Sequence, residues 1–238
     1  MSATNRGADR EDEDTYCTPG WCAARLLERY SIPAGSTVLD PCAASGELLA
    51  EIKRLRPDLK LYAFELREDE RPKLEALVAS GVLEGFILAD FLELAKASEG
   101  IQFDYVISNP PYSLAQEFVE ACAKVASVTL FLLRINFLGG SKRYPFTNAT
   151  RPGLFTLPNR PCFTGWGSDA TEYAWFVYGD GALTGHWEPL ALTPTKVISE
   201  WNDAAKLRYP HLKPELVKAR KAVKKAAQKE VDATKAAA

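Results

Sequence analysis

The tetrapeptide Asn109-Pro110-Pro111-Tyr112, which follows the apolar stretch Phe103–Ser108, has the residue types best suited to chemistry in this sequence. Neither proline can donate a backbone hydrogen bond, and each has a fixed φ angle, so the turn is stiff. Pro110 also keeps Asn109 out of the helical region. The turn therefore presents an amide side chain, carbonyl oxygens that are free to accept, and an aromatic ring.

These groups suit a planar exocyclic amine such as N6 of adenine. The two N–H groups of the amine can donate to the Asn109 side-chain oxygen and the Pro110 carbonyl, and Tyr112 can stack on the ring. Held by two acceptors, the nitrogen can pyramidalise and direct its lone pair at an electrophile. The tetrapeptide alone also allows a plain proline-rich turn with Tyr112 as a surface aromatic.

Three acidic residues each close a predicted strand: Asp40 ends 37–40, Glu65 ends 61–65 and Asp90 ends 85–90. Helical patterns at 46–55, 70–80 and 114–126 alternate with these and with further strands at 103–108, 128–133 and 173–178. This order predicts an α/β fold with a doubly wound, mostly parallel sheet. Ligands of such sheets bind at the carboxyl ends of the strands, where the acids and Asn109 are expected.

The segment Asp40-Pro41-Cys42-Ala43-Ala44-Ser45-Gly46 is a tight turn of small residues between a predicted strand and helix. Small residues let a ligand approach the backbone closely. Glu65 is placed to accept from ribose hydroxyls, and Asp90 could accept from an adenine amine. Each acid alone is compatible with a solvated charge or a helix N-cap, whereas the set predicts an adenosine-containing cofactor. The absence of a Gly-Lys-Ser/Thr ending argues against a nucleoside triphosphate.

The order of these motifs from Thr18-Pro19 to Asn109–Tyr112 resembles that of the class I S-adenosylmethionine-dependent methyltransferases. Within them the chain is most similar to the DNA adenine-N6 enzymes, over about residues 16–133. The stretch 160–177 also resembles small phage-type adenine methyltransferases. The resemblance implies a Rossmann-like methyltransferase fold with an antiparallel strand at one end of the sheet, which would include 173–178, and S-adenosylmethionine as cofactor.

The resemblance also implies a role for each matching residue. Thr18 would hold the methionine carboxylate, and Asp40 and Pro41 with the turn Ala44–Gly46 would hold the amino group and backbone of the methionine. Glu65 would bind the ribose and Asp90 the cofactor adenine. The target base would be held by Asn109, Pro110, Pro111 and Tyr112. One departure is that Ala44 stands where the family has the first glycine of its loop, so a methyl group crowds the cofactor.

The segment 139–172 is predicted to be a loop-rich insertion in which basic and aromatic residues alternate. This combination suits a nucleic-acid surface, and it is equally compatible with a lid or small subdomain over the sheet. Phe163 and Trp166 are candidates for a second stacking wall against the target base. The candidate substrate-binding residues are Arg134, Lys142, Arg143, Phe163 and Trp166.

Composition and length predict one ordinary globular domain over 15–212 of the 238 residues. Residues 1–14 are expected to be disordered, and 213–238 to form a basic, Lys/Ala-rich helix or tail. The net charge of -2 gives no overall nucleic-acid signature. Five cysteines without a Cys-x-x-Cys pair and two isolated histidines predict a reducing, cytoplasmic location and no metal site. The polar N-terminus and short apolar runs predict no signal peptide and no membrane span.

The function predicted from these features is methyl transfer from S-adenosylmethionine to N6 of adenine in DNA, with the target base flipped out of the duplex. A base amine in RNA and the side-chain amide of a protein glutamine are also planar and remain as alternatives. A catalytically inactive nucleic-acid-binding accessory protein is the alternative of another class. Recognition of a specific DNA sequence would have to come from residues 139–172, or the enzyme would have low sequence specificity.

Overall fold

The computed structural model describes residues 17–97, 102–168 and 170–218. The predicted N-terminal segment 1–14 and most of the predicted tail 213–238 lie outside the described residues. The described chain forms one eight-stranded sheet of order β3-β2-β1-β4-β5-β7-β6-β8. The strands are β1 (Thr37–Asp40), β2 (Lys60–Glu65), β3 (Gly85–Leu88), β4 (Phe103–Ser108), β5 (Ala126–Arg134), β6 (Gly153–Leu157), β7 (Tyr173–Tyr178) and β8 (Trp187–Pro189).

Strand β7 is the reversed strand of the sheet. It pairs antiparallel with β5 on one side and with β6 on the other, whereas β1, β2, β3, β4 and β5 pair in parallel. Strand β8 then pairs in parallel with β6. The prediction of a doubly wound, mostly parallel α/β sheet with an antiparallel strand at one end is confirmed.

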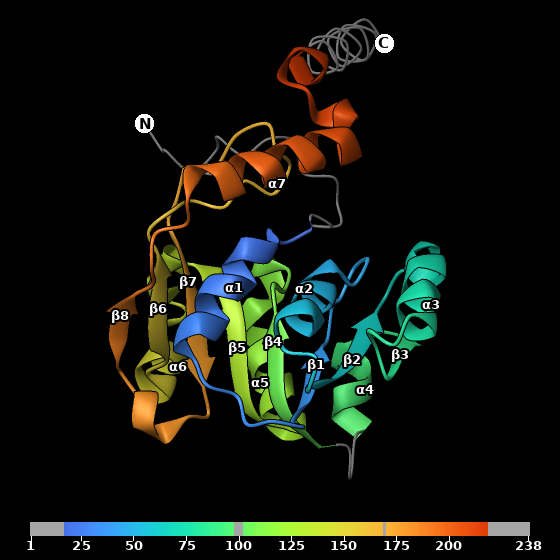
Figure 1. Cartoon of the computed structure of the whole chain (residues 1–238). Helices are drawn as coiled ribbons and strands as arrows, with labels where there is room; N and C mark the ends of the chain where they lie inside the picture. Colours follow the sequence, from blue (N-terminus) through green and yellow to red (C-terminus); the bar gives the residue numbers. More distant parts are fainter. Residues whose placement is uncertain (1–16, 98–101, 169, 219–238) are drawn as a thin grey trace, which may run out of the picture.

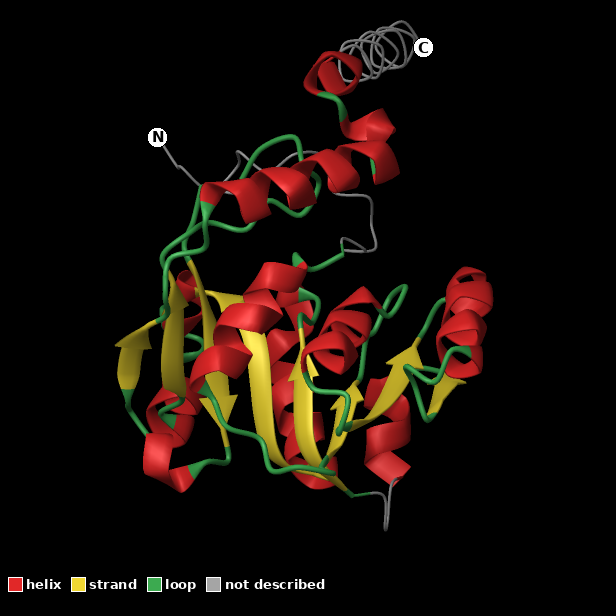
Figure 2. Cartoon of the chain, in the orientation of Figure 1, coloured by secondary structure: helices red, strands yellow, loops and turns green. Residues whose placement is uncertain are grey.

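Helices cover both faces of the sheet (Figures 1 and 2). Helices α1 (Gly20–Arg29), α2 (Glu47–Leu55) and α3 (Arg71–Ala79) pack on one face, and α4 (Phe91–Ala97) and α5 (Ala115–Val125) pack on the other. Successive residues of a strand point to opposite faces, so β5 places Leu130 and Leu132 in the first core and Phe131 and Leu133 in the second. A strand that is buried on both faces is expected to be apolar, as the run Leu130–Leu133 of β5 is.

The segment 139–172 is more ordered than its loop-rich sequence predicts. It contains helix α6 (Tyr144–Thr150) and the buried strand β6. The helix was not recognised because Thr, Asn and Pro are weak helix formers, although Pro145 lies in the first turn, where proline is tolerated. Strand β6 begins at Gly153, where a Cβ would lie only 2.8 Å from the Leu183 carbonyl oxygen.

The strand predicted to end at Asp90 ends at Leu88, and α4 begins directly after Asp90. Helix α7 (Thr195–Arg208) was not predicted and lies across the top of the molecule in Figure 1. All five cysteines are free. Among the described residues, the helices are too short or too polar to span a bilayer.

Candidate functional site

The carboxyl ends of β1 and β4 lie side by side and bring Asp40 next to Asn109. The two strands pair in parallel with Leu39 opposite Val106, so the residues that follow them meet at one edge of the sheet. A cavity of about 30 Å³ opens there and is lined by Thr18, Asp40, Ala44 and Asn109. Its other lining residues are Cys17, Cys42, Ala43, Ser45, Glu47 and Leu48. Three of the predicted cofactor residues therefore share a cavity with Asn109, whereas Glu65, Asp90 and Tyr112 are not among the residues that line it.

Asp40 is a buried carboxylate with internal donors. Its side chain accepts a hydrogen bond of 2.7 Å from the Ser108 hydroxyl and one of 3.1 Å from the Cys42 amide. Burial disfavours the charged form and raises the pKa of Asp40 to about 7, although the two donors act in the opposite direction. A cationic ligand in the cavity would favour the ionised carboxylate.

The turn between β1 and α2 contains two residues with positive φ. Ala44 has φ 49°, an uncommon value for a residue with a side chain, and Gly46 has φ 76°. A Cβ on Gly46 would lie 2.3 Å from Leu77 Cδ1, so this position also requires glycine for space. The Ala44 amide donates to Glu65 Oε2 at 2.7 Å, which ties the turn to the end of β2.

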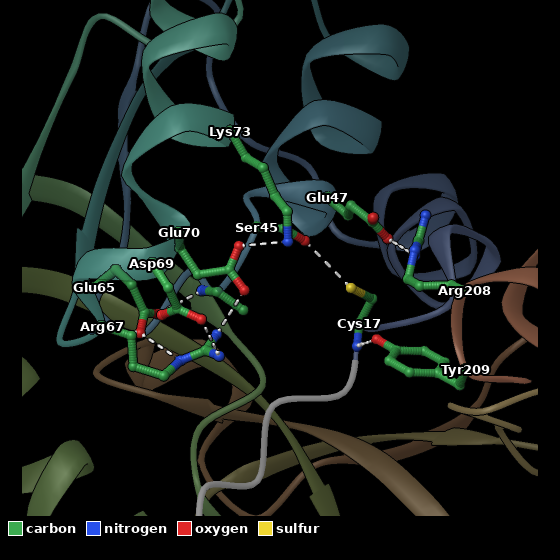
Figure 3. Close-up of polar contacts among 11 residues, drawn as sticks. Cys17, Ser45, Glu47, Glu65, Arg67, Asp69, Glu70, Lys73, Arg208 and Tyr209 are labelled. Carbon is green, nitrogen blue, oxygen red and sulfur yellow. Dashed lines mark hydrogen bonds and ion pairs between the residues drawn. The ribbon is translucent and has the colours of Figure 1, made fainter. Parts of the chain in front are cut away.

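Glu65 is buried at the end of β2, the strand end where it was predicted. Its second oxygen accepts from the Arg67 amide at 3.0 Å and from Arg67 Nε at 3.1 Å, and Arg67 also pairs with Glu70 (Figure 3). Asp90 is exposed, and its Oδ1 accepts from the amides of Leu92 and Glu93. Asp90 therefore serves as the N-cap of α4 in this structure.

The Asn109–Tyr112 turn is held by its own tyrosine. The Tyr112 hydroxyl donates to Asn109 Oδ1 at 2.9 Å, and Pro110 is buried beneath the turn. The Arg134 guanidinium lies 5.0 Å from the centre of the Tyr112 ring, and Arg134 Nε donates to the Tyr173 hydroxyl at 3.2 Å. Arg134 and Tyr173 meet because they are register partners in β5 and β7.

Aromatic rings gather beside the turn. The Tyr173 ring centre lies 6.0 Å from that of Tyr112 and 5.5 Å from that of Phe163. Trp166 lies elsewhere, against the end of α7, where its Nε1 donates to the Tyr209 carbonyl at 2.9 Å. Of the two candidates for a second stacking wall, the structure brings Phe163 to the ring cluster and uses Trp166 to anchor α7.

A second hollow, of about 470 Å³, is lined by Tyr112. Lys142 and Arg143 line it, and Lys142 is exposed. The Arg143 guanidinium lies 4.8 Å from the centre of the Phe137 ring, in a cation–π arrangement. The remaining lining residues are Ser113, Gln116, Glu117, Phe137, Gly140 and Ser141.

Four residues of the site were not recognised in the sequence, namely Cys17, Glu47, Ser108 and Tyr173. Cys17 and Glu47 directly flank Thr18 and Gly46, and Ser108 directly precedes Asn109. Their sequence signal was adjacency to a motif, because a residue beside a ligand turn often faces the same cavity. Tyr173 gave no such signal, since it reaches the site only through the pairing of β7 with β5.

The donor set fits S-adenosylmethionine. A buried carboxylate suits an ammonium group, a turn in the left-handed region suits close approach to the backbone, and Glu65 closes the neighbouring strand. These groups follow one another along the carboxyl edge from β4 through β1 to β2. An extended ligand with a cationic end could therefore run along this edge.

No protein-family model matches the sequence, and no curated protein matches it. Solved structures do match. A protein assigned as an RNA methyltransferase from Pyrococcus horikoshii aligns with TM-score 0.54 and 16% identity over 68% of this chain and 86% of that chain. A protein assigned as an O-methyltransferase from Agrobacterium tumefaciens aligns with TM-score 0.52 and 16% identity over 77% and 96%. One assigned as a class I S-adenosylmethionine-dependent methyltransferase from Listeria monocytogenes aligns with TM-score 0.52 and 18% identity over 77% and 70%. This chain has the class I S-adenosylmethionine-dependent methyltransferase fold.

Proposed function

We propose that this protein transfers a methyl group from S-adenosylmethionine to N6 of adenine in DNA. The observation that carries the proposal is the shared cavity at the ends of β1 and β4. Asp40, which suits the methionine ammonium, lines it together with Asn109, which suits the target amine. A methyl donor held by the first would lie beside an amine held by the second.

The cofactor, when bound, supplies the electrophilic methyl group. Asn109 Oδ1 and the Pro110 carbonyl accept the two N–H groups of the target amine and turn its lone pair toward that methyl group. The Tyr112 hydroxyl, which now donates to Asn109 Oδ1, gives up this bond to the incoming amine. No general base is needed before the attack, because the proton on the nitrogen becomes acidic only after methylation and is lost then.

The ring cluster of Tyr112, Tyr173 and Phe163 supports an aromatic substrate. A base that has left the duplex needs stacking partners to replace its neighbours. The partly exposed rings of Tyr112 and Phe163 would serve as these partners, and the fully buried Tyr173 ring packs against both of them. Lys142 is exposed in the hollow that Tyr112 also lines and would contact the phosphates that flank the base. Arg143, whose guanidinium packs on Phe137, would add positive charge to the same hollow. The Arg134 guanidinium lies against the Tyr112 ring and would support a base that stacks there.

A base amine in RNA is the second candidate substrate. The same clamp and the same rings would serve it, and the Pyrococcus horikoshii structure with this fold is assigned as an RNA methyltransferase. Unstacked bases of single-stranded RNA are also recognised by aromatic side chains.

The test is transfer of labelled methyl groups to unmethylated duplex DNA, total RNA and a protein extract in parallel, with nucleoside analysis of the products. We expect N6-methyladenine in DNA. Asn109→Ala should lower the rate by about 100-fold or more while cofactor affinity stays within about twofold, because only the target amine loses an acceptor. Asn148→Ala, at an exposed position on α6, is the matched control.

Label in RNA alone would keep the mechanism and replace the substrate. A fully active Asn109→Ala protein would contradict the clamp. A protein that binds no S-adenosylmethionine and labels nothing would favour the accessory-protein alternative.

A further inference from the structure

The end of α7 contacts two residues that line the cofactor cavity (Figure 3). The Tyr209 hydroxyl accepts a hydrogen bond of 3.0 Å from the Cys17 amide. The Arg208 guanidinium forms an ion pair with Glu47, the first residue of α2. Cys17 Sγ in turn lies 3.3 Å from Ser45 Oγ in the turn between β1 and α2. The end of α7 therefore connects to both sides of the cavity.

Helix α7 is also held by contacts outside the cavity, so the positions of Arg208 and Tyr209 do not depend on the cavity residues alone. The indole N–H groups of Trp166 and Trp201 donate to the carbonyls of Tyr209 and Cys162, each at 2.9 Å. Gly165 approaches the helix so closely that a Cβ there would lie 2.3 Å from the Asn202 carbonyl oxygen. The connection between β6 and β7 therefore holds α7 in place through these hydrogen bonds and this close contact.

The Tyr209 hydroxyl is a dependable neutral acceptor. Burial raises the pKa of Tyr209 further above its ordinary value, so the hydroxyl stays protonated at physiological pH. By accepting from the Cys17 amide, it fixes the backbone just before Thr18. Cys17 and Thr18 both line the cavity. The bond to Tyr209 therefore fixes the position of this part of the cavity wall.

Arg208 has an electrostatic role. Glu47 places a negative charge in the wall of a cavity that is proposed to take the methionine end of the cofactor, which has a carboxylate of its own. An unpaired Glu47 would repel that carboxylate. Arg208 neutralises Glu47 from outside the cavity.

We propose, on the basis of the proposed function, that Arg208 and Tyr209 are positioning residues of the cofactor site. Tyr209 holds the Cys17–Thr18 backbone in the cavity wall that would face the methionine end of the cofactor. Arg208 cancels the charge of Glu47, so that the cavity accepts a carboxylate. Neither residue touches the reacting atoms, and both act through residues of the cavity wall.

The role of Tyr209 can be measured without cofactor, through alkylation of cysteine thiols with peptide mapping. Cys17 is 8% exposed and Cys22 is fully buried, so Cys22 serves as an internal reference. Tyr209→Phe removes one hydrogen bond and should accelerate labelling of Cys17 about fivefold while Cys22 stays unchanged. The matched control is Tyr178→Phe, because among the described residues the Tyr178 hydroxyl is buried without a hydrogen-bond partner.

The role of Arg208 is tested by a double-mutant cycle on the dissociation constant of S-adenosylmethionine. Arg208→Gln should weaken binding about fivefold, Glu47→Gln alone should not weaken it, and the double variant should return to within about twofold of wild type. Arg54→Gln, which breaks the exposed pair with Glu51 on the same helix α2, should have no effect.

Two results would overturn the inference. A double variant as weak as Arg208→Gln would exclude charge compensation, and a Tyr209→Phe protein with unchanged Cys17 labelling would exclude the positioning role of Tyr209. A wild-type protein that binds no S-adenosylmethionine, while Cys17 labelling still responds to Tyr209→Phe, would overturn the proposed function. The contact between α7 and Cys17 would then stand without its role in cofactor binding.

Discussion

Asp40 is the residue whose charge most directly governs the proposed cofactor site. Burial raises its pKa to about 7, and the donors Ser108 and Cys42 only partly offset this effect. In the folded protein without ligand, Asp40 is therefore close to half protonated at neutral pH. A methionine ammonium needs the ionised form as its partner.

Cofactor affinity should therefore depend on pH. Below about pH 7 binding must remove the Asp40 proton, so the dissociation constant should rise by up to about tenfold per pH unit toward pH 5 and level off above about pH 8. Calorimetric titration with S-adenosylmethionine between pH 5 and pH 8 would measure this change in the dissociation constant. Asp40→Asn should bind weakly at every pH and remove the dependence. Affinity that is constant with pH in the wild-type protein would contradict the role of Asp40.

The same group has an opposite effect on stability. Its folded pKa lies above the unfolded value of about 3.9, so the folded state holds the Asp40 proton more tightly than the unfolded state does. The free energy of unfolding should consequently fall as pH rises from about 4 to about 7. Asp40→Asn should lessen this fall when chemical denaturation is measured across the range, and an unchanged profile would argue against the raised pKa.

Several residues of the site could be predicted from sequence alone because their motifs are local. Asn109–Tyr112 is stiff through its own prolines, and the strand ends at Asp40 and Glu65 follow from apolar runs. Asp90 shows the limit of this reasoning. It was predicted to end a strand, but β3 ends at Leu88 and the Asp90 side chain caps α4, a helix that was not predicted from the sequence.

At the scale of elements, the turn between β1 and α2 depends on Gly46. We expect Gly46→Ala to lower the free energy of unfolding by about 2–4 kcal/mol. The left-handed backbone contributes about 1–2 kcal/mol and the clash with Leu77 the rest. Gly81→Ala is the control, because Gly81 also has positive φ but has no atom within 4 Å of its Cβ position. If chemical denaturation gave equal losses in the free energy of unfolding for the two variants, the close approach of α3 to Gly46 would not contribute to stability.

The parallel strands of the sheet could be predicted from the sequence more completely than the strands beyond β5, because their signals are local. Strands β1, β2 and β4 have apolar runs that end in a polar residue, which is a local signal. Strand β6 and helix α6 are short, and their stability comes from packing against β7 and Phe137. Their sequences therefore look like loop.

At the scale of the whole molecule, a net charge of -2 means that nucleic-acid affinity must come from local cations. Lys142→Ala should weaken DNA binding uniformly across sequences and reduce the slope of log affinity against log salt by about 1. Lys60→Ala, at the amino end of β2 and therefore at the opposite edge of the sheet, should change neither quantity. Binding titrations at several salt concentrations check this. An unchanged slope for Lys142→Ala would place the phosphates elsewhere.

The hydrogen bond between Cys17 and Tyr209 joins residues 192 positions apart in the sequence. Such a contact closes a long loop of chain, and the entropy of this closure must be offset by structure that has already formed. We therefore expect this part of the cavity wall to form after the sheet that carries Asp40.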